Sequence, residues 1–445
     1  MRRVFSFLLV TCLLLSLCAC HVDDNTTTAP SNTNANTNTT APSGTTAPPV
    51  DVDITIRTDG WINAESITER NLVFAYGGCY YLAEMGSSFL SFLDVNNGIS
   101  VVLCSKPGCK HHEETSVKKA MECDAYLSHN TVFLHLYDDK IYYAGNDDGY
   151  GGYDLYRRNA DGTGKEKIAE LGTQYVTQKS SISIVYYIPA GSKLYYKVDV
   201  QESTKNENGI STVEIVKRAL MCYDLNAGKE VLIEEFVEDA PHMIAARDSQ
   251  LLFYTVPSSS ALDRNDPDYK EKLNALPTRL KVWDESVGQT DAVFEKTYAE
   301  WKGKGFVADG KYYYSARTQD EEGNDVYGMF AYDLGTEKVE TADITGMPLD
   351  GRYSLKHDSE SGEDYFYDLQ TQTRLPNEFA AQNLYIEDMG DEGFILSKGY
   401  NKAEMTDDGG KIGDYTVYAY VTYDALTDGL QAADCLDFYT KHYGE

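Results

Sequence analysis

Residues 153–168 read YDLYRRNADGTGKEKI, two runs of strand-forming residues on either side of Asn159-Ala160-Asp161-Gly162. Asn, Asp and Gly tolerate the positive φ angles that tight hairpin turns need. Alternation of apolar and polar residues places every second side chain on one face of a strand. The stretch Tyr153–Ile168 therefore predicts a β-hairpin with an apolar face to bury.

The outline of this hairpin recurs along the chain, in two alternating types of strand. The first type is apolar and rich in tyrosine, and its copies are Tyr80–Glu84, Lys140–Gly145, Lys193–Val198, Leu251–Val256, Lys311–Ala316 and Phe394–Lys398. The second type ends near an Asp and continues through a tight turn into another strand, as in Ala219–Ile233, Met329–Val339 and Tyr365–Leu375, with Arg279–Phe294 the weakest copy. Most successive copies of the first type lie roughly 40 to 60 residues apart, a spacing typical of repeat folds.

This repeat predicts an all-β fold for residues 51–445. One hairpin pair cannot bury its apolar face alone, whereas a circle of small sheets can, and it leaves only short edges. With a short unit at Arg352–Leu375, the repeats predict a β-propeller of seven blades, with six or eight as alternatives. The alternating segment Asp51–Arg57 is expected to supply an outer strand that closes the circle with the last blade.

The residues from Tyr153 to Gly164 resemble the repeat of TolB-like β-propellers. The layout of the whole chain, with Leu17-Cys18-Ala19-Cys20, a polar linker and a Tyr-rich repeat, is similar to that of surface lipoproteins of clostridia-like bacteria. The resemblance covers most of residues 60–440, and only the second unit matches closely. It implies a fold far more than a function, because propellers host binding, scaffolding and catalysis alike.

The N-terminus predicts export and a lipid anchor. Met1-Arg2-Arg3 precedes an apolar run from Val4 to Leu17 that is too short to span a bilayer, as in a signal peptide over residues 1–19. Leu17-Cys18-Ala19-Cys20 resembles the bacterial lipobox, which implies lipidation of Cys20 by diacylglycerol and acyl chains such as palmitate. Residues 20–50 are rich in Thr, Asn and Pro and are expected to form a disordered tether.

These features place the expected propeller at the extracytoplasmic face of a bacterial cell membrane. The formal net charge of −31 argues against nucleic acid and against docking on anionic lipid headgroups. The membrane is therefore expected to be contacted through the lipid anchor alone.

One cluster of residues carries metal-ligand chemistry. Cys104, Cys109, His111 and Cys123 place three thiols and an imidazole within about twenty residues, and Pro107-Gly108 forms a turn between the first two cysteines. This set suits a structural Cys₃His zinc site. The spacing also suits a disulfide such as Cys109–Cys123, which an exported chain slightly favours. Either reading predicts a structural clip.

The remaining candidates carry less chemistry. Cys79, Cys222 and Cys435 stand alone in strand-like contexts and are expected to be buried as small apolar residues. Tyr150 and Tyr153 are candidates for a binding face. Acidic loops such as 263–268 do not follow the EF-hand order and are interpreted as solvated turns. The insertion Pro257–Pro277 predicts a short helix on a loop.

The function expected from these patterns is non-catalytic binding of a protein, peptide or glycan at the cell surface. The alternatives are an enzyme on the same scaffold that acts on polysaccharide through paired carboxylates, and a structural component of an envelope assembly. No Gly-x-Ser-x-Gly, phosphate loop or His-Glu-x-x-His motif is present in the sequence.

Overall fold

The structure is a computed structural model, and it describes most of the chain between Gly60 and Gly444. Within that span it leaves out residues 65–71, 77, 82–87, 112–116, 128–130, 132, 146–151, 206–210, 258–261, 320–321, 343–346, 349–352, 359–360, 369–370, 382–383, 390–392, 401–403, 406–410, 413–415, 429–435 and 441–442. The signal peptide, Cys20, the tether and Asp51–Arg57 therefore lie outside the described residues.

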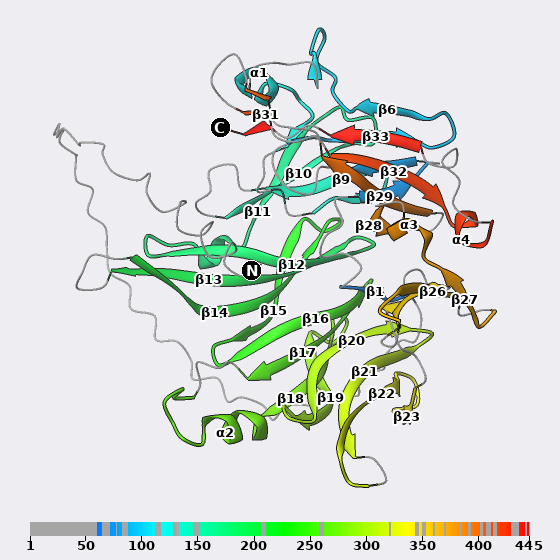
Figure 1. Cartoon of the computed structure of the whole chain (residues 1–445). Coiled ribbons are helices and arrows are strands. Elements are labelled where there is room, and N and C mark those ends of the chain that lie inside the picture. The colour runs from blue at the N-terminus through cyan, green and yellow to red at the C-terminus, as the bar shows by residue number, and fades with distance from the viewer. Residues whose placement is uncertain are drawn as a thin grey trace, which may run out of the picture. The chain divides into compact units, whose positions relative to one another are not determined.

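The described residues form small antiparallel sheets, most of them built from four strands that lie close together along the chain (Figure 1). The first three are β2 (Leu72–Ala75), β3 (Gly78–Tyr81), β5 (Ser91–Asp94) and β6 (Ile99–Val102); β8 (His135–Tyr137), β9 (Lys140–Gly145), β10 (Tyr153–Asn159) and β11 (Glu166–Leu171); and β12 (Ser180–Ala190), β13 (Lys193–Lys205), β14 (Ser211–Asp224) and β15 (Lys229–Phe236). A fourth sheet has five strands: β1 (Ile62–Asn63), β16 (Asp239–Arg247), β17 (Gln250–Pro257), β18 (Pro277–Asp284) and β19 (Gln289–Thr297).

The C-terminal half of the chain repeats the same four-stranded pattern. Its sheets are β20 (Trp301–Ala308), β21 (Lys311–Gln319), β22 (Asp325–Asp333) and β23 (Val339–Thr341); β24 (Met347–Pro348), β25 (Tyr353–His357), β26 (Asp364–Asp368) and β27 (Thr373–Pro376); and β28 (Tyr385–Met389), β29 (Gly393–Tyr400), β32 (Thr416–Thr422) and β33 (Leu436–Thr440). The predicted tyrosine-rich strands are confirmed, because each becomes the second strand of its four-strand meander.

Short elements decorate these sheets. They are the ladders β4 (Ser88–Phe89) with β7 (Tyr126–Leu127) and β30 (Glu404–Met405) with β31 (Lys411–Ile412) and β34 (Tyr443–Gly444), the helices α1 (Val117–Met121), α2 (Tyr269–Ala275), α3 (Glu378–Ala381) and α4 (Asp424–Asp428), and the 3₁₀ turn Thr173–Tyr175. The predicted helix in the insertion Pro257–Pro277 is confirmed as α2, which lies between β17 and β18.

The hairpin predicted for Tyr153–Ile168 is formed by β10 and β11. Gly162 in its turn has φ +84°, and a Cβ atom there would lie 2.6 Å from the carbonyl oxygen of Leu103. Only glycine fits such a position, because a side chain would meet both backbone strain and a clash. The turn therefore packs tightly on the residue that follows β6 of the preceding sheet.

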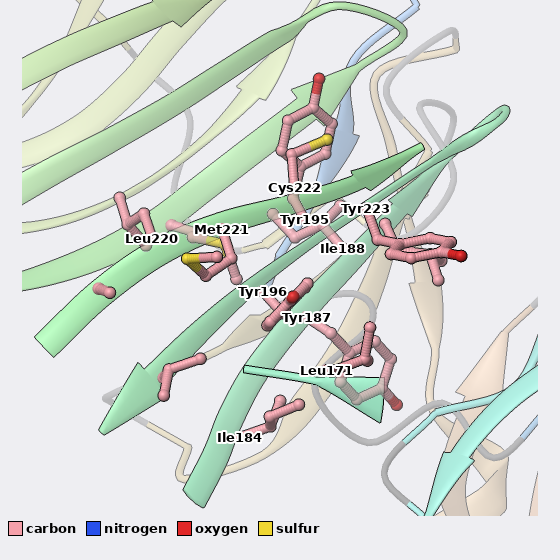
Figure 2. Packing of buried hydrophobic residues seen from close by; sticks show 14 of the residues in the cluster. Leu171, Ile184, Tyr187, Ile188, Tyr195, Tyr196, Leu220, Met221, Cys222 and Tyr223 are labelled. Atoms are coloured by element: carbon pink, nitrogen blue, oxygen red, sulfur yellow. The ribbon is translucent and has the colours of Figure 1, made fainter. Parts of the chain in front are cut away.

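The core lies between successive sheets. The largest apolar cluster joins the β8–β11, β12–β15 and five-stranded sheets, and Figure 2 shows part of it, with Tyr195, Tyr196, Met221 and Cys222 packed around the middle strands. Tyr196 is 1% exposed and Cys222 is 1% exposed. Most of the described sheets thus bury apolar side chains against a neighbouring sheet, as the repeat predicts.

The first and last sheets also pack against each other. Cys79, Tyr81 and Leu93 of the first sheet form one buried cluster with Ile395 and Tyr420 of the last. The chain therefore has a β-propeller arrangement, and the predicted all-β class is confirmed.

The predicted number of seven blades is not confirmed. The described residues form six plain four-stranded sheets, and six was among the numbers that the sequence allowed. The additional sheet departs from the pattern because β1 is added to the edge of its four-strand meander β16–β19.

The N-terminal strand β1 pairs in the middle of the fold. Ile62 lies opposite Ala246 of β16, and the amide of Ala64 donates to the carbonyl of Ile244 at 2.6 Å. Asn63 reaches the neighbouring sheet, where its side chain exchanges two hydrogen bonds with the backbone of Val307 in β20, at 2.8 and 2.7 Å. The residues just before the propeller therefore link two successive sheets.

Candidate metal centre

The candidate site lies in the loop between β6 and β8, which contains α1 and β7. The turn at Pro107-Gly108 is closed by the amide of Cys109, which donates to the carbonyl of Lys106 at 3.3 Å. Gly108 has φ +75°, a conformation that glycine adopts without strain. On the other side of the loop, β7 pairs with β4, so that Phe89 lies opposite Tyr126. The two ends of the loop are thereby brought together.

The loop brings all four predicted ligands to one place. The ligand atoms of Cys104, Cys109, His111 and Cys123 lie within 4.8 Å of one another, and the Cys123 sulfur lies 3.6 Å from Nδ1 of His111. Ligand atoms around a tetrahedral zinc ion are separated by about 3.4–3.8 Å. The three thiols are free cysteines in the structure. The cluster is therefore compatible with a metal site, and the slight preference for a disulfide is not confirmed.

Backbone amides point at two of the sulfur atoms. The amide of Lys106 donates to the sulfur of Cys104 at 3.4 Å, and the amide of Asp124 hydrogen-bonds the same sulfur. The amide of Ala125 hydrogen-bonds the sulfur of Cys123. Such donors stabilise negative charge on sulfur, which is the form that binds a metal.

The two thiols respond to their surroundings in opposite directions. Burial raises the pKa of the Cys123 thiol, which is 5% exposed. Burial also opposes ionisation of Cys104, yet the amide of Lys106 and the neighbouring Cys123 thiol together lower the pKa of Cys104. A metal ion that binds here displaces the remaining thiol protons, so its affinity falls as the pH falls.

Apolar side chains close the inner side of the cluster. Phe89 is fully buried and packs with Ala120 and Ala125. Its ring lies edge-on to the imidazole of His111, with 6.4 Å between the ring centroids. A wall of this kind limits the access of water and restricts the rotation of the imidazole.

Two polar contacts hold the halves of the loop together. The hydroxyl of Ser105 donates to the carboxylate of Asp124 at 3.0 Å, and the ammonium of Lys106 donates to the carbonyl of Glu122 at 2.9 Å. Both contacts join residues beside Cys104 to residues beside Cys123. The ligand positions are thus fixed by the loop itself.

Sequence reasoning missed one residue next to the centre. Arg158 of β10 donates through Nη2 to the carbonyl of Asp124 at 2.8 Å and to the hydroxyl of Tyr143 at 2.9 Å. Its side chain is fully buried. Nothing in the motif predicts that it is buried while its neighbour Arg157 is half-buried and paired with Glu166.

The other predicted residues that the structure describes do not join this centre. Tyr153 is half-buried at the start of β10 and packs against the main apolar cluster. Tyr150, Cys20 and Cys435 lie outside the described residues. Cys79 and Cys222 are buried, as predicted.

The described part of the acidic loop 263–268 behaves as a solvated turn. The carboxylate of Asp263 accepts a hydrogen bond from the amide of Asn265, and Asp266 pairs with Lys272.

Among the residues that the structure describes, no helix is long and apolar enough to cross a membrane.

Comparison with known proteins gives structural neighbours only. No protein-family description matches the chain, and no curated protein does. Similar solved structures include an oligogalacturonate lyase in complex with manganese (15% identity, 76% of this chain and 84% of that chain, TM-score 0.38). The β-propeller domain of the Trilobed protease from Pyrococcus furiosus (11%, 70% and 92%, TM-score 0.37) is another. TolB from Acinetobacter baumannii is a third (11%, 84% and 78%, TM-score 0.33).

Propellers, TolB among them, are thus among the structures similar to this chain. They include enzymes as well as TolB, and TM-scores this low carry no argument about function.

Proposed function

We propose that the chain is a lipid-anchored extracytoplasmic propeller that binds a protein, peptide or glycan, and that a structural zinc ion clips the loop between its first two described sheets. The observation that carries the zinc part is the convergence of four ligand atoms within 4.8 Å. Four protein ligands leave a tetrahedral ion no open position, and this is the arrangement of structural rather than catalytic zinc. The ion would replace the hydrophobic core that so short a loop cannot build.

Elemental analysis of the untagged chain tests the zinc clip. We expect about one zinc per chain in the wild type and in Cys222→Ala, and little or none in Cys123→Ala. Cys222 is the matched control because it is buried in a different cluster. Absence of zinc, together with fewer free thiols than residues 51–445 have cysteines, would overturn the clip and leave a disulfide in its place.

The anchor is supported by the sequence of residues 1–20, with the basic start, the apolar run and the Leu17–Cys20 lipobox. Replacement Cys20→Ser removes the thiol that the lipobox places at the acylation site; Cys18 is a poorer candidate because the bulky Leu17 directly precedes it. We expect the wild-type chain in the membrane fraction, with labelled palmitate incorporated, and the variant released. Recovery of the wild-type chain as a free species would overturn the anchor.

The binding role is supported by the propeller arrangement, since rigid blades present their connecting loops as interaction surfaces. We propose that the five-stranded sheet is also a blade, with β1 added to its edge, so that the propeller has seven blades. Cross-linking of partners on intact cells, followed by a glycan array, tests binding. Release of reducing ends from a polysaccharide by the purified chain would instead favour the enzyme.

A further inference from the structure

Among the described residues, Arg158 is a buried cation without an anionic partner of its own. Its side chain is 0% exposed, and its Nε and Nη1 atoms are buried with no hydrogen-bond partner in the described part of the chain. Its contacts are the carbonyl of Asp124, the hydroxyl of Tyr143 and the face of the Tyr143 ring, whose centroid lies 5.3 Å from Cζ. None of these contacts carries a negative charge.

A buried charge is costly unless an opposite charge compensates for it. A zinc ion with three thiolates and a neutral imidazole carries one net negative charge, and the guanidinium carries one positive charge. The loaded centre and Arg158 together are therefore neutral. The cation that looks uncompensated beside free thiols gains a counter-ion once the metal is bound.

A single peptide group connects the two charges. The carbonyl of Asp124, which accepts from Arg158, and the amide of Ala125, which hydrogen-bonds the sulfur of Cys123, belong to the same planar peptide. A donor on the carbonyl oxygen polarises the peptide and strengthens the hydrogen bond that its N–H group makes. The guanidinium thus acts on the most deeply buried ligand through one peptide.

We propose that Arg158 is a positioning residue and the counter-charge of the metal centre: it fixes the Asp124–Ala125 peptide against the Cys123 thiolate and favours the metal-bound state. This inference rests on the proposed zinc clip. The contact between Arg158 and the metal centre also links two sheets, because the ligands lie in the loop after β6 and Arg158 lies on β10 of the next sheet.

The test uses the full untagged chain and three variants. Arg158→Gln removes the charge but keeps hydrogen-bond donors, and Arg158→Lys keeps the charge. Arg157→Gln is the matched control, because Arg157 neighbours Arg158 on the same strand but is only half-buried and is paired with Glu166. Zinc affinity is measured by competition with a chromogenic chelator, and the pH dependence of binding is measured from the thiolate-to-metal absorption of the cobalt-substituted chain.

We expect Arg158→Gln to weaken zinc binding about 10–100-fold, the range typical of residues that support metal ligands. The cobalt absorption of this variant should also develop at higher pH, because the thiolates lose a stabilising charge. Arg158→Lys should lie within a few-fold of the wild type, and Arg157→Gln should be unchanged. A purely structural role would lower stability without moving the pH profile.

Unchanged zinc affinity and an unchanged cobalt profile in Arg158→Gln would overturn the proposal. If that variant fails to fold, Arg158→Met, which fills a similar volume without polar atoms, gives the same comparison. Should the wild type itself bind no zinc, the zinc clip fails and the role of Arg158 fails with it. Zinc bound equally by wild type and variant is a different outcome, and it contradicts the role of Arg158 alone.

Discussion

Aspartates at the ends of third strands organise the turns of several sheets. The carboxylate of Asp94 accepts the amides of Asn96 and Asn97, at 3.0 and 3.1 Å. Asp224 accepts two amides in the same way, and Asp333 does so as well. The side chain of each Asp therefore closes its own turn, which explains why strands of the second type end near this residue.

These turns predict a dependence of stability on pH. The side-chain amide of Asn97 lowers the pKa of Asp94, and the amide of Thr336 lowers the pKa of Asp333. Burial opposes ionisation of Asp224, yet Lys193 and the turn amides lower its pKa. A carboxyl group whose pKa is lower in the folded state stabilises the fold above its unfolded value of about 3.9, and this contribution disappears as the pH falls through the folded value.

We therefore expect the urea midpoint of unfolding to fall as the pH is lowered from about 5 to 3. Asp333→Asn removes one such group, so the loss between those two pH values should be smaller in this variant. A midpoint that does not change over this interval would contradict the account of the turns.

Two glycines allow the energetic cost of backbone strain to be compared with the cost of strain and a steric clash together. Gly303 has φ +85°, and a Cβ atom there would lie 2.0 Å from the ring of Tyr254. Gly288 has φ +68° with no atom within 4 Å of its Cβ position. We expect Gly303→Ala to lower the free energy of unfolding by about 2–4 kcal/mol and Gly288→Ala by about 1 kcal/mol. Equal losses of unfolding free energy in the two variants, measured with urea, would contradict this prediction and show that the Tyr254 ring moves aside at no energetic cost.

At this scale the sequence predicts what short-range spacing can encode. Cys104, Cys109, His111 and Cys123 are close in sequence, and the structure brings their ligand atoms together. Arg158 could not be predicted, because its contact with Asp124 joins residues 34 positions apart. Arg157 and Arg158 point to opposite faces of β10, and only tertiary packing decides which of the two faces buries its arginine.

At the scale of elements, β1 is held by a side chain as much as by its backbone. The amide group of Asn63 copies the donor and acceptor of a strand residue and satisfies both backbone groups of Val307, which is 4% exposed. A buried backbone group left without a partner costs about 1–3 kcal/mol.

We therefore expect Asn63→Ala to reduce the free energy of unfolding by roughly 2 kcal/mol. Asn97→Ala is the control, because Asn97 makes its side-chain bond to Asp94 on an exposed turn. The expected change in the control is within about 0.5 kcal/mol. A loss in Asn63→Ala no greater than in Asn97→Ala would mean that β1 adds little to the joint between the two sheets.

The sequence predicted most strands but not the partner of the N-terminal one. Asp51–Arg57 alternates and was expected to close the circle with the last blade, but it lies outside the described residues. The strand that the structure describes, Ile62–Asn63, has too few residues to show a period, and it pairs with β16. The strand pattern of Arg279–Phe294 is weak in the sequence. Its pairing in the sheet shows that the segment belongs to two regular strands, β18 beside β17 and β19 beside β18.

At the scale of the whole molecule, the repeat determines the architecture because each sheet depends on its neighbours for burial. The cluster of Cys79 and Tyr81 with Ile395 and Tyr420 joins the two ends of the repeat, which no local pattern could predict. The number of blades is hard to predict from the sequence because some strands are very short. A strand of two residues such as β24 shows no alternation of apolar and polar residues by which it could be recognised.

Metal removal should act on one loop and leave the remaining sheets folded. We expect a chelator to make residues 103–127 sensitive to limited proteolysis, since the described loop contains only the short elements α1 and β7. Cys123→Ser should show the same cleavage without chelator. Identical digestion of the wild type with and without chelator would contradict the clip.

X-ray absorption spectroscopy at the zinc edge of the untagged wild-type chain shows directly whether the four predicted ligands hold a zinc ion. We expect a four-coordinate shell of three sulfur atoms at about 2.3 Å and one nitrogen atom at about 2.0 Å. A shell dominated by oxygen, or zinc absent from a chain whose loop cysteines form a disulfide, would contradict it.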